Sequence, residues 1–363
     1  MAKMLALAAA LAAAAFATTA TAAEMSPELK QLVEAAKKEG ALTLAWAQDV
    51  MGGADGAKLF EAAINKAYGT NIAIKFVPSI PQPALASKIV TEAAAGQKAT
   101  SDVYIGANYA ASILTTRNGM IAEPWTKLLP GRITDDIVEE GGQAVRFATG
   151  FPGVTYNTEL VPAAHVPQKL NDLLDPWWKG KLASTVYAAS FEAVSSPDML
   201  GYQGSLDFIK KLAPQLSGLI RCGDGERIAT GEYAALALDC SSQQATYWKR
   251  KGAPVAQAQL LDAAQLRYWY VGVPKNAAHP AAAALWITYA LTPEGQALVR
   301  KTWDVDLDSF PEVPDHALAG ELKAKGAKMI AMTIPYWNAH TEMDKAKDEM
   351  VEILRTSKTN AKK

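Results

Sequence analysis

The regular alternation of apolar strand-like runs with helical segments constrains this chain more than any other feature. Apolar runs occur at 41–47, 71–78 and 101–106, and apolar residues recur at helical spacing in the segments between them, as in 57–69. The runs are apolar on both faces, which is typical of parallel strands covered by helices on both sides of a sheet. The sequence therefore predicts an α/β fold.

A second block of the same kind follows Gly150. Strand-like runs at 217–222 and 233–240 enclose a short helical segment. Two extended, proline-flanked segments, 151–162 and 266–274, lie at the seams of the blocks, where the chain would cross between lobes. We therefore expect two lobes, each a mostly parallel sheet flanked by helices, joined by hinge crossings.

The N-terminus predicts export. Residues 1–23 carry Lys3 near the start, an apolar stretch at 4–16 and then small residues, as in a cleaved secretory signal peptide. We expect a mature chain that begins near Glu24 and enters the periplasm.

The length of the chain favours two domains. About 340 of the 363 residues would remain after cleavage, which is more than one core usually holds. We predict a signal peptide at 1–23, lobe I at 24–148 plus 270–325, lobe II at 149–269, and C-terminal helices at 326–363 that pack on lobe II.

The charge balance argues against a polyanionic partner. The formal net charge is -1, and charged residues make up 20% of the chain. Nucleic-acid-binding proteins usually carry a clustered basic excess. We expect no nucleic acid as a partner.

Two lobes joined by crossings would enclose a cleft. In open α/β sheets, ligands bind outside the carboxyl ends of the strands, where loops lead into helix starts. Aromatic, hydroxyl and charged residues gather at these predicted ends. The candidate ligand-binding residues are Trp46, Asp49, Tyr109, Tyr156, Tyr187, Ser190, Phe191, Ser241, Ser242, Arg267 and Trp269.

The same turns leave the charge of the ligand open. Serine hydroxyls and the amides of helix starts suit an oxyanion, and Arg221 or Arg267 could add a bidentate contact. Four acidic residues would instead repel an anion and could face an amine, with Trp46 or Trp269 as a cation–π wall. These acidic residues are Asp49, Asp224, Glu226 and Asp239. We favour a small organic anion.

The chain has two cysteines, Cys222 and Cys240. If the runs at 217–222 and 233–240 are neighbouring parallel strands, their ends lie about 5 Å apart, within the reach of a disulfide. An oxidising compartment favours such a bond. No histidine stands at metal spacing, and no base for a nucleophilic cysteine is visible. We predict a disulfide, and no resident metal.

The run "GDGERI" begins like a dinucleotide-binding fingerprint. Ile228 stands where the third glycine belongs, so we interpret the run as a ligand loop or a plain turn. We expect no cofactor.

Three segments resemble the periplasmic solute-binding proteins of ABC importers, in the branch that includes ferric-iron and polyamine binders. They are "GVTYNTELV" (153–161), "LNDLLDPWWKGKLA" (170–183) and "VGVPKNAAHPAAAALWITYALTPEGQALVRK" (271–301). The resemblance implies a type II periplasmic-binding fold and a ligand closed between the lobes without chemical change. It also implies delivery to an ABC permease and its ATPase. We expect a monomer.

The chain departs from the iron binders of this branch at one place. Those proteins carry adjacent tyrosines after the strand that here ends at Cys240, Ser241 and Ser242. Phenolates are the hard oxygen donors that ferric iron prefers. We therefore do not expect ferric iron, although a cationic amine or another metal ion in the cleft stays an alternative.

A secreted hydrolase is the alternative from another class. The sequence has neither a G-x-S-x-G elbow nor an H-E-x-x-H helix, which counts against an enzyme.

Overall fold

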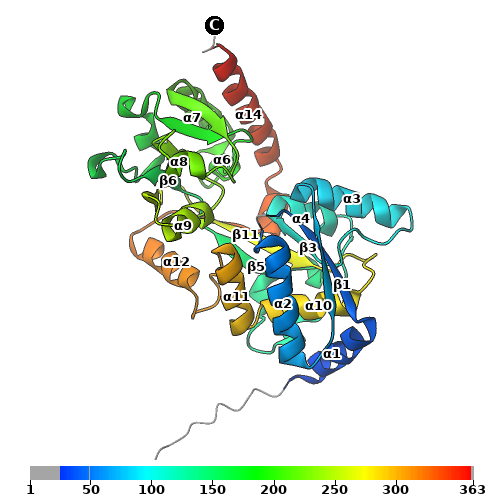
Figure 1. Cartoon of the computed structure of the whole chain (residues 1–363). Helices are drawn as coiled ribbons and strands as arrows, with labels where there is room; N and C mark the ends of the chain where they lie inside the picture. Colours follow the sequence, from blue (N-terminus) through cyan, green and yellow to red (C-terminus); the bar gives the residue numbers. More distant parts are fainter. Residues whose placement is uncertain (1–24, 49, 361–363) are drawn as a thin grey trace, which may run out of the picture.

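The computed structural model describes residues 25–48 and 50–360 and shows two lobes (Figure 1). The predicted signal peptide and Asp49 lie outside the described residues. Within the described ranges, no helix is both long enough and apolar enough to cross a membrane.

Lobe I is built from two stretches of the chain. The first contains α1 (Pro27–Glu39), β1 (Ala41–Trp46), α2 (Gly53–Tyr68), β2 (Ala73–Pro78), α3 (Gln82–Ala94), β3 (Tyr104–Ala107), α4 (Asn108–Thr115), α5 (Trp125–Leu128), β4 (Val138–Glu139) and β5 (Ala144–Gly150). The second contains β11 (Ala264–Gly272), α10 (Pro280–Ala290), α11 (Pro293–Trp303), α12 (Pro314–Ala324) and β12 (Met329–Met332).

Lobe II lies between these stretches in the sequence. It contains β6 (Val154–Asn157), β7 (Leu182–Thr185), α6 (Phe191–Val194), α7 (Gly201–Leu212), β8 (Leu216–Ile220), α8 (Glu226–Ala229), β9 (Ala235–Leu236), α9 (Gln243–Arg250) and β10 (Val255–Ala258). The chain ends with α13 (Ile334–Ala339) and α14 (Glu342–Asn360).

Local capping signals begin and end several helices. The Ser26 side chain accepts a hydrogen bond from Leu29 N–H at the start of α1, and Gly40 ends this helix with φ 63°. Thr292 caps α11 in the same way, by accepting from Gly295 N–H. Such capping bonds satisfy backbone groups that lack a partner inside the helix.

The sheet of lobe I is mixed. Strands β1 and β2 pair in parallel, and a parallel bridge joins Leu44 to Val103, just before β3. The long strand β11 pairs antiparallel with β3 and β5 and parallel with β12. The expectation of mostly parallel strands holds for β1 to β3 and fails at β11, because this strand returns from the other lobe and enters the sheet from the opposite end.

The sheet of lobe II has the order β10-β6-β9-β7-β8. Strands β9, β7 and β8 are parallel neighbours, whereas β6 pairs antiparallel with β9 and β10. The antiparallel pairs again lie where the chain crosses between lobes. The predicted lobe boundaries, 148/149 and 269/270, fall inside the crossing strands β5 and β11 and stay a prediction.

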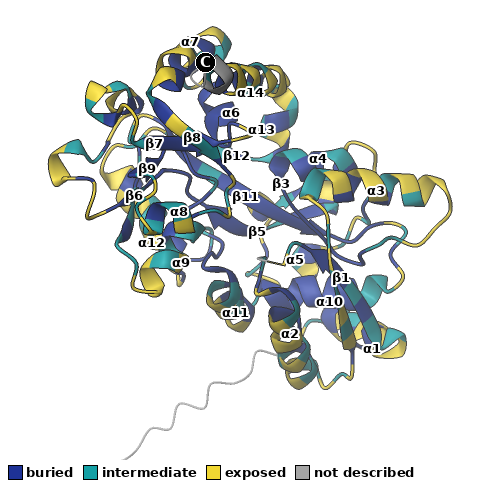
Figure 2. Cartoon of the chain, turned by 45° about the horizontal axis from the view of Figure 1, so that its top comes forward, coloured by how far each residue is buried: buried dark blue, intermediate teal, exposed yellow. Residues whose placement is uncertain are grey.

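Each lobe has its own apolar core, visible as buried strands in Figure 2. Phe60, Tyr104 and Trp286 belong to the core cluster of lobe I, and Phe191 and Leu212 to that of lobe II. Helix α14 adds three side chains to the second cluster, namely Ala346, Met350 and Leu354.

A third, smaller cluster joins the lobes. It consists of Ala193, Ile330, Met332, Trp337 and Met343, from α6, β12, α13 and α14. We call it the hinge cluster.

Candidate functional site

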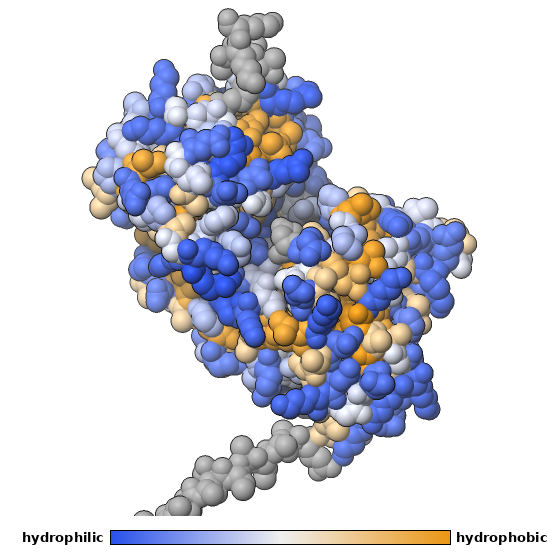
Figure 3. Space-filling view, in the orientation of Figure 1, coloured by the Kyte–Doolittle hydropathy of each residue, from blue (hydrophilic) through white to orange (hydrophobic). Residues whose placement is uncertain are grey.

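The strand ends of the two lobes face each other across a recess, which Figure 3 shows between the upper and the lower body. Strand β11 crosses at the floor of this region. Alternate residues of a strand share a face, and Gln265, Arg267 and Trp269 all face loops of lobe II. The Gln265 amide donates to the Ser190 carbonyl at 2.9 Å.

Arg267 is the centre of this arrangement. It is buried, forms an ion pair with Glu192 at the start of α6, and donates to the Cys240 carbonyl at 3.4 Å. The other carboxyl oxygen of Glu192 is buried without a hydrogen-bond partner among the described residues. Arg267 therefore brings little net charge to a ligand, because Glu192 neutralises it.

Trp269 and Ser241 meet at Gly150. A Cβ atom on Gly150 would lie 2.7 Å from Ser241 Oγ and 2.8 Å from the Trp269 ring. Trp269 also packs on Trp303, with ring centroids 4.8 Å apart. Only glycine at position 150 lets the loop of lobe II approach the indole this closely.

Ser190 holds the loops of lobe II together. Its φ is 67°, a left-handed value that is costly for a residue other than glycine. The Ser190 hydroxyl donates to the Asp239 carbonyl at 2.6 Å, and the residue is fully buried. We therefore assign it a positioning role.

The Asp239 carboxylate does not face a ligand, contrary to the sequence interpretation. It is buried in lobe II and accepts hydrogen bonds from Gly153 N–H, the Thr155 hydroxyl and the Gln257 amide. Burial raises the pKa of Asp239, and these hydrogen bonds oppose the rise, so that the pKa lies at about 7 rather than 3.8. The Asp239 carboxylate is bound by donors of lobe II and is buried away from the recess, so it does not repel an anion there.

The predicted disulfide between Cys222 and Cys240 is present, with Cα atoms 5.7 Å apart. The reasoning that led to it was wrong in one respect, because β7 lies between β8 and β9, so the two cysteine strands are not neighbours. The loops beyond the strand ends meet over the end of β7.

Tyr187 of lobe II interacts with Arg267 of β11 and with Tyr109 of lobe I. The Tyr187 hydroxyl accepts from Cys222 N–H at 2.8 Å, and 37% of the residue is exposed. Burial raises the pKa of Tyr187 and nearby Tyr109 adds to this rise, whereas the hydrogen bond from Cys222 and the charge of Arg267 lower it. Tyr109, Tyr187 and Arg267 therefore line one region between the lobes.

Lys347 joins this region from α14, and the sequence interpretation missed it. Its ammonium group lies 4.5 Å from the centroid of the Tyr109 ring. Burial raises the pKa of the neighbouring Asp344, Lys347 lowers it and Glu192 raises it. A lysine in a long charged helix gives no local sign of which residues it faces.

Three other candidates take packing roles. Trp46 lies in the core of lobe I, with its ring centroid 5.7 Å from that of Trp286. Phe191 is fully buried in lobe II, and Tyr156 packs against the same core. We leave these three out of the site proposed below.

The helices α2, α4 and α9 begin where β1, β3 and β9 end. Their N-cap residues, Gly52, Ala107 and Ser242, make no side-chain capping bond within the described chain. Such helix starts carry partial positive charge. The first N–H of α2, that of Gly53, donates to the Val50 carbonyl at 2.9 Å, and that of α9, Gln243, donates to the Ser241 hydroxyl at 3.3 Å. In the described ranges, no group of three or more His, Cys, Asp or Glu residues could hold a metal ion.

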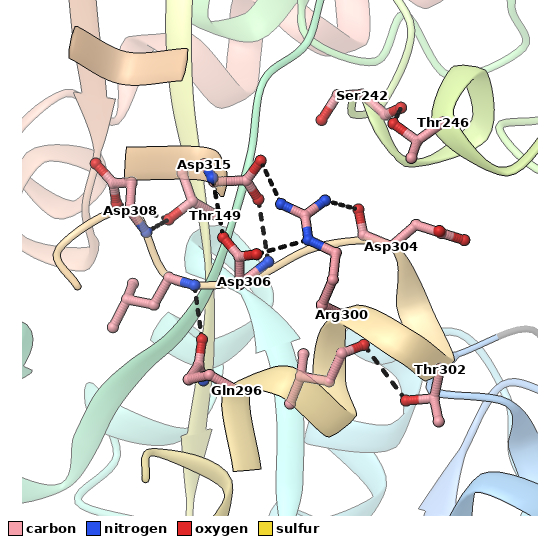
Figure 4. A network of polar contacts seen from close by, with 12 residues as sticks. Thr149, Ser242, Thr246, Gln296, Arg300, Thr302, Asp304, Asp306, Asp308 and Asp315 are labelled. Carbon is pink, nitrogen blue, oxygen red and sulfur yellow. Dashed lines mark hydrogen bonds and ion pairs between the residues drawn. The ribbon is translucent and has the colours of Figure 1, made fainter. Parts of the chain in front are cut away.

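An ion pair joins the lobes at the far side of α9. Arg250 of α9 donates to both carboxyl oxygens of Asp304 at the end of α11, at 2.8 and 3.2 Å. Asp304 belongs to a polar network with Arg300, Asp306 and Asp315 (Figure 4). Ser242 of α9 lies across from this network in the same view.

Sequence comparison identifies related proteins. The family model described as "Bacterial extracellular solute-binding protein" matches residues 57–329. An uncharacterized protein of Haemophilus influenzae is 27% identical over 224 residues, which cover 56% of this chain and 62% of that protein. The chain therefore matches less than two thirds of this relative's length.

Solved structures share the fold at low identity. A substrate-binding protein of an ABC transporter from Agrobacterium tumefaciens has a TM-score of 0.69 at 17% identity, covering 88% of this chain and 97% of that one. AgtB of A. tumefaciens, solved with agropinic acid, has a TM-score of 0.67 at 16% identity, and the match covers 87% of this chain and 99% of AgtB. AfuA of Actinobacillus pleuropneumoniae, solved with fructose-6-phosphate, has a TM-score of 0.67 at 20% identity, and the match covers 87% of this chain and 99% of AfuA. These similarities confirm the predicted two-lobed type II fold.

Proposed function

The chain belongs to the bacterial extracellular solute-binding proteins, and from this premise we propose that it carries a small organic anion to an ABC importer. In this proposal the mature protein acts in the periplasm as a monomer. It presents the closed, loaded form to a permease and its ATPase.

The anionic ligand is proposed from three helix starts, those of α2, α4 and α9, whose N-cap side chains make no capping bond in the described chain. The Ser241 hydroxyl accepts from Gln243 N–H at 3.3 Å, and Ser242 stands beside it at the start of α9. Amide N–H groups and hydroxyls are the donors that carboxylate and phosphate oxygens prefer. Lys347 adds a cation, whose ammonium group lies 4.5 Å from the centroid of the Tyr109 ring and whose charge also acts on Asp344.

A cationic amine is the competing ligand. The unpartnered carboxyl oxygen of Glu192 could accept a hydrogen bond from an ammonium group. Arg267 already neutralises the same carboxylate, so Glu192 offers an ammonium group little net negative charge. For this reason we favour the anion.

Binding would act by closure of the lobes. A ligand that contacts both lobes binds the closed form better than the open form and shifts the population toward it. In this protein the helix starts α2 and α4 belong to lobe I and α9 to lobe II, so one anion between them would contact both.

The test is a thermal-shift and scattering experiment on the mature chain. The probes are citrate, inorganic phosphate, fructose 6-phosphate, spermidine and ferric ion. We expect at least one of the anions to raise the melting temperature, since a ligand at 100 times its Kd stabilises the folded state by about 2.7 kcal/mol. The same anion should contract the radius of gyration. If spermidine alone stabilises the protein, the proposed anionic ligand is wrong and a cationic amine takes its place in the proposal.

A matched variant locates the effect. The double substitution S241A/S242A should weaken the binding of the anion about tenfold, because it removes two hydroxyls near the start of α9. Ser217, on the exposed side of β8, serves as the control in S217A. Mass spectrometry of the recovered anion separates carrier from hydrolase, since a carrier returns it unchanged.

A further inference from the structure

We propose that the Cys222–Cys240 disulfide positions the solute site, because each half-cystine holds one side chain that lines it. This inference rests on the proposed function, since it concerns the same recess.

The Cys222 half holds Tyr187. The backbone N–H of Cys222 donates to the Tyr187 hydroxyl at 2.8 Å. The preceding residue, Arg221, donates its N–H to the Asp224 carboxylate at 2.8 Å, and Asp224 N–H returns to the Arg221 carbonyl at 3.1 Å. This turn is closed on itself and directly follows Ile220, the last residue of β8, whose carbonyl accepts from Val186 N–H at 3.0 Å.

The Cys240 half holds Arg267. The Cys240 carbonyl accepts from the Arg267 guanidinium, which also pairs with Glu192. The residue before it, Asp239, is fixed by hydrogen bonds to the crossing strands. The Cys240 side is therefore anchored firmly in lobe II.

The sheet joins the two halves only indirectly, through β7. Strand β7 lies between β8 and β9, and β9 has two residues, Ala235 and Leu236. The covalent bond thus adds a direct link between the turn that follows β8 and the anchored loop that contains Cys240. It sets the position of Tyr187 relative to Arg267, and of both relative to Tyr109 in lobe I.

The first measurement needs no ligand. Labelling with 15N-cysteine gives two amide resonances, since the chain has two cysteines. In the oxidised protein, we expect the Cys222 amide to exchange slowly, because it donates to Tyr187. Reduction of the bond to two thiols by a phosphine should speed this exchange at least tenfold. Oxidised Y187F, which lacks the acceptor, should show the same increase.

The second measurement uses citrate as the probe. We expect C222S/C240S to bind citrate at least tenfold more weakly than the wild type. Leu354→Ala is the matched control, because it destabilises the core of lobe II from α14 without touching either loop. Its citrate affinity should stay within twofold of the wild-type value.

The outcomes separate the two proposals. If the wild type binds citrate, equal affinity of C222S/C240S overturns the positioning role. If no anion of the panel binds the wild type, the proposed anionic ligand fails, and the amide exchange alone decides. Unchanged exchange of the Cys222 amide on reduction, in a protein that stays folded by circular dichroism, overturns the inference.

Discussion

The two sides of the boundary between the lobes are built in opposite ways. On the side of α13 and α14, the hinge cluster is apolar and buried, and the Tyr336 hydroxyl donates to Asp198 at 2.6 Å at its edge. On the side of α9 and α11, the lobes meet through Arg250 and Asp304, and 54% of the Arg250 side chain is exposed. Apolar burial is costly to undo, whereas exposed ion pairs contribute little. We infer that the first side is the hinge and the second side opens.

The end of α11 supports this difference. Asp304 has φ 58° at the C-cap, a position that glycine fills at the ends of α1 and α2. Its N–H donates to the Arg300 carbonyl, and its own carbonyl accepts from the Arg300 side chain at 2.8 Å. A glycine would end the helix with less strain. The aspartate instead presents a carboxylate to the other lobe.

The largest expected effect comes from the hinge cluster. Trp337→Ala should lower the free energy of unfolding by about 3–5 kcal/mol, because it leaves a cavity among buried side chains of both lobes. Urea denaturation measures this loss. Trp177→Ala is the control, since Trp177 is half-buried on lobe II, away from the boundary. A loss in W337A no larger than in the control would break the comparison.

The next largest effect is on the pH dependence of stability, and it comes from carboxyls buried within each lobe rather than from contacts between the lobes. Burial raises the pKa of Asp239 in lobe II and of Asp315 in lobe I, each from 3.8 to about 7. Between about pH 4 and pH 7 the folded chain therefore binds more protons than the unfolded chain. The contribution of these two carboxyls to stability is greatest below this window and falls as the pH rises through it.

Asp239→Asn should flatten this fall by on the order of 2 kcal/mol between the two ends of the window. Urea melts at a series of pH values measure the slope. Asp315→Asn should also reduce the fall in stability with pH, and its effect should add to that of Asp239→Asn because the two carboxyls lie in different lobes. A slope that neither variant changes would show that neither group titrates in the folded protein.

The sequence predicted the architecture because the signals for it are local. Helix caps such as Ser26 and Gly40, and apolar strands between helices, require only neighbouring residues. The type II fold followed from these and from the family resemblance. The disulfide was predicted from the compartment, although its strands are separated by β7.

The candidate site was harder to predict because it depends on pairing across long separations. Arg267 appeared as a possible ligand contact, yet its partner Glu192 lies 75 residues away in the sequence. Trp46 and Phe191 stand beside predicted strand ends, where an aromatic residue looks the same whether it faces the cleft or the core. Local pattern does not fix the direction of such a side chain.

The smallest effect on stability should come from the opening side, and it tests the comparison most directly. Arg250→Ala removes an ion pair whose arginine side chain is 54% exposed, so the free energy of unfolding should fall by less than about 1 kcal/mol. The radius of gyration of the ligand-free protein should nevertheless increase, because the pair holds the lobes together on the side that opens. Raising the salt to 1 M should open the wild type and leave R250A unchanged, since salt screens exposed charges.

The matched control is Arg227→Ala, which breaks the exposed pair with Glu232 inside lobe II. R227A should leave the radius unchanged, and equal expansion in both variants would assign the change to lost charge rather than to the boundary between lobes.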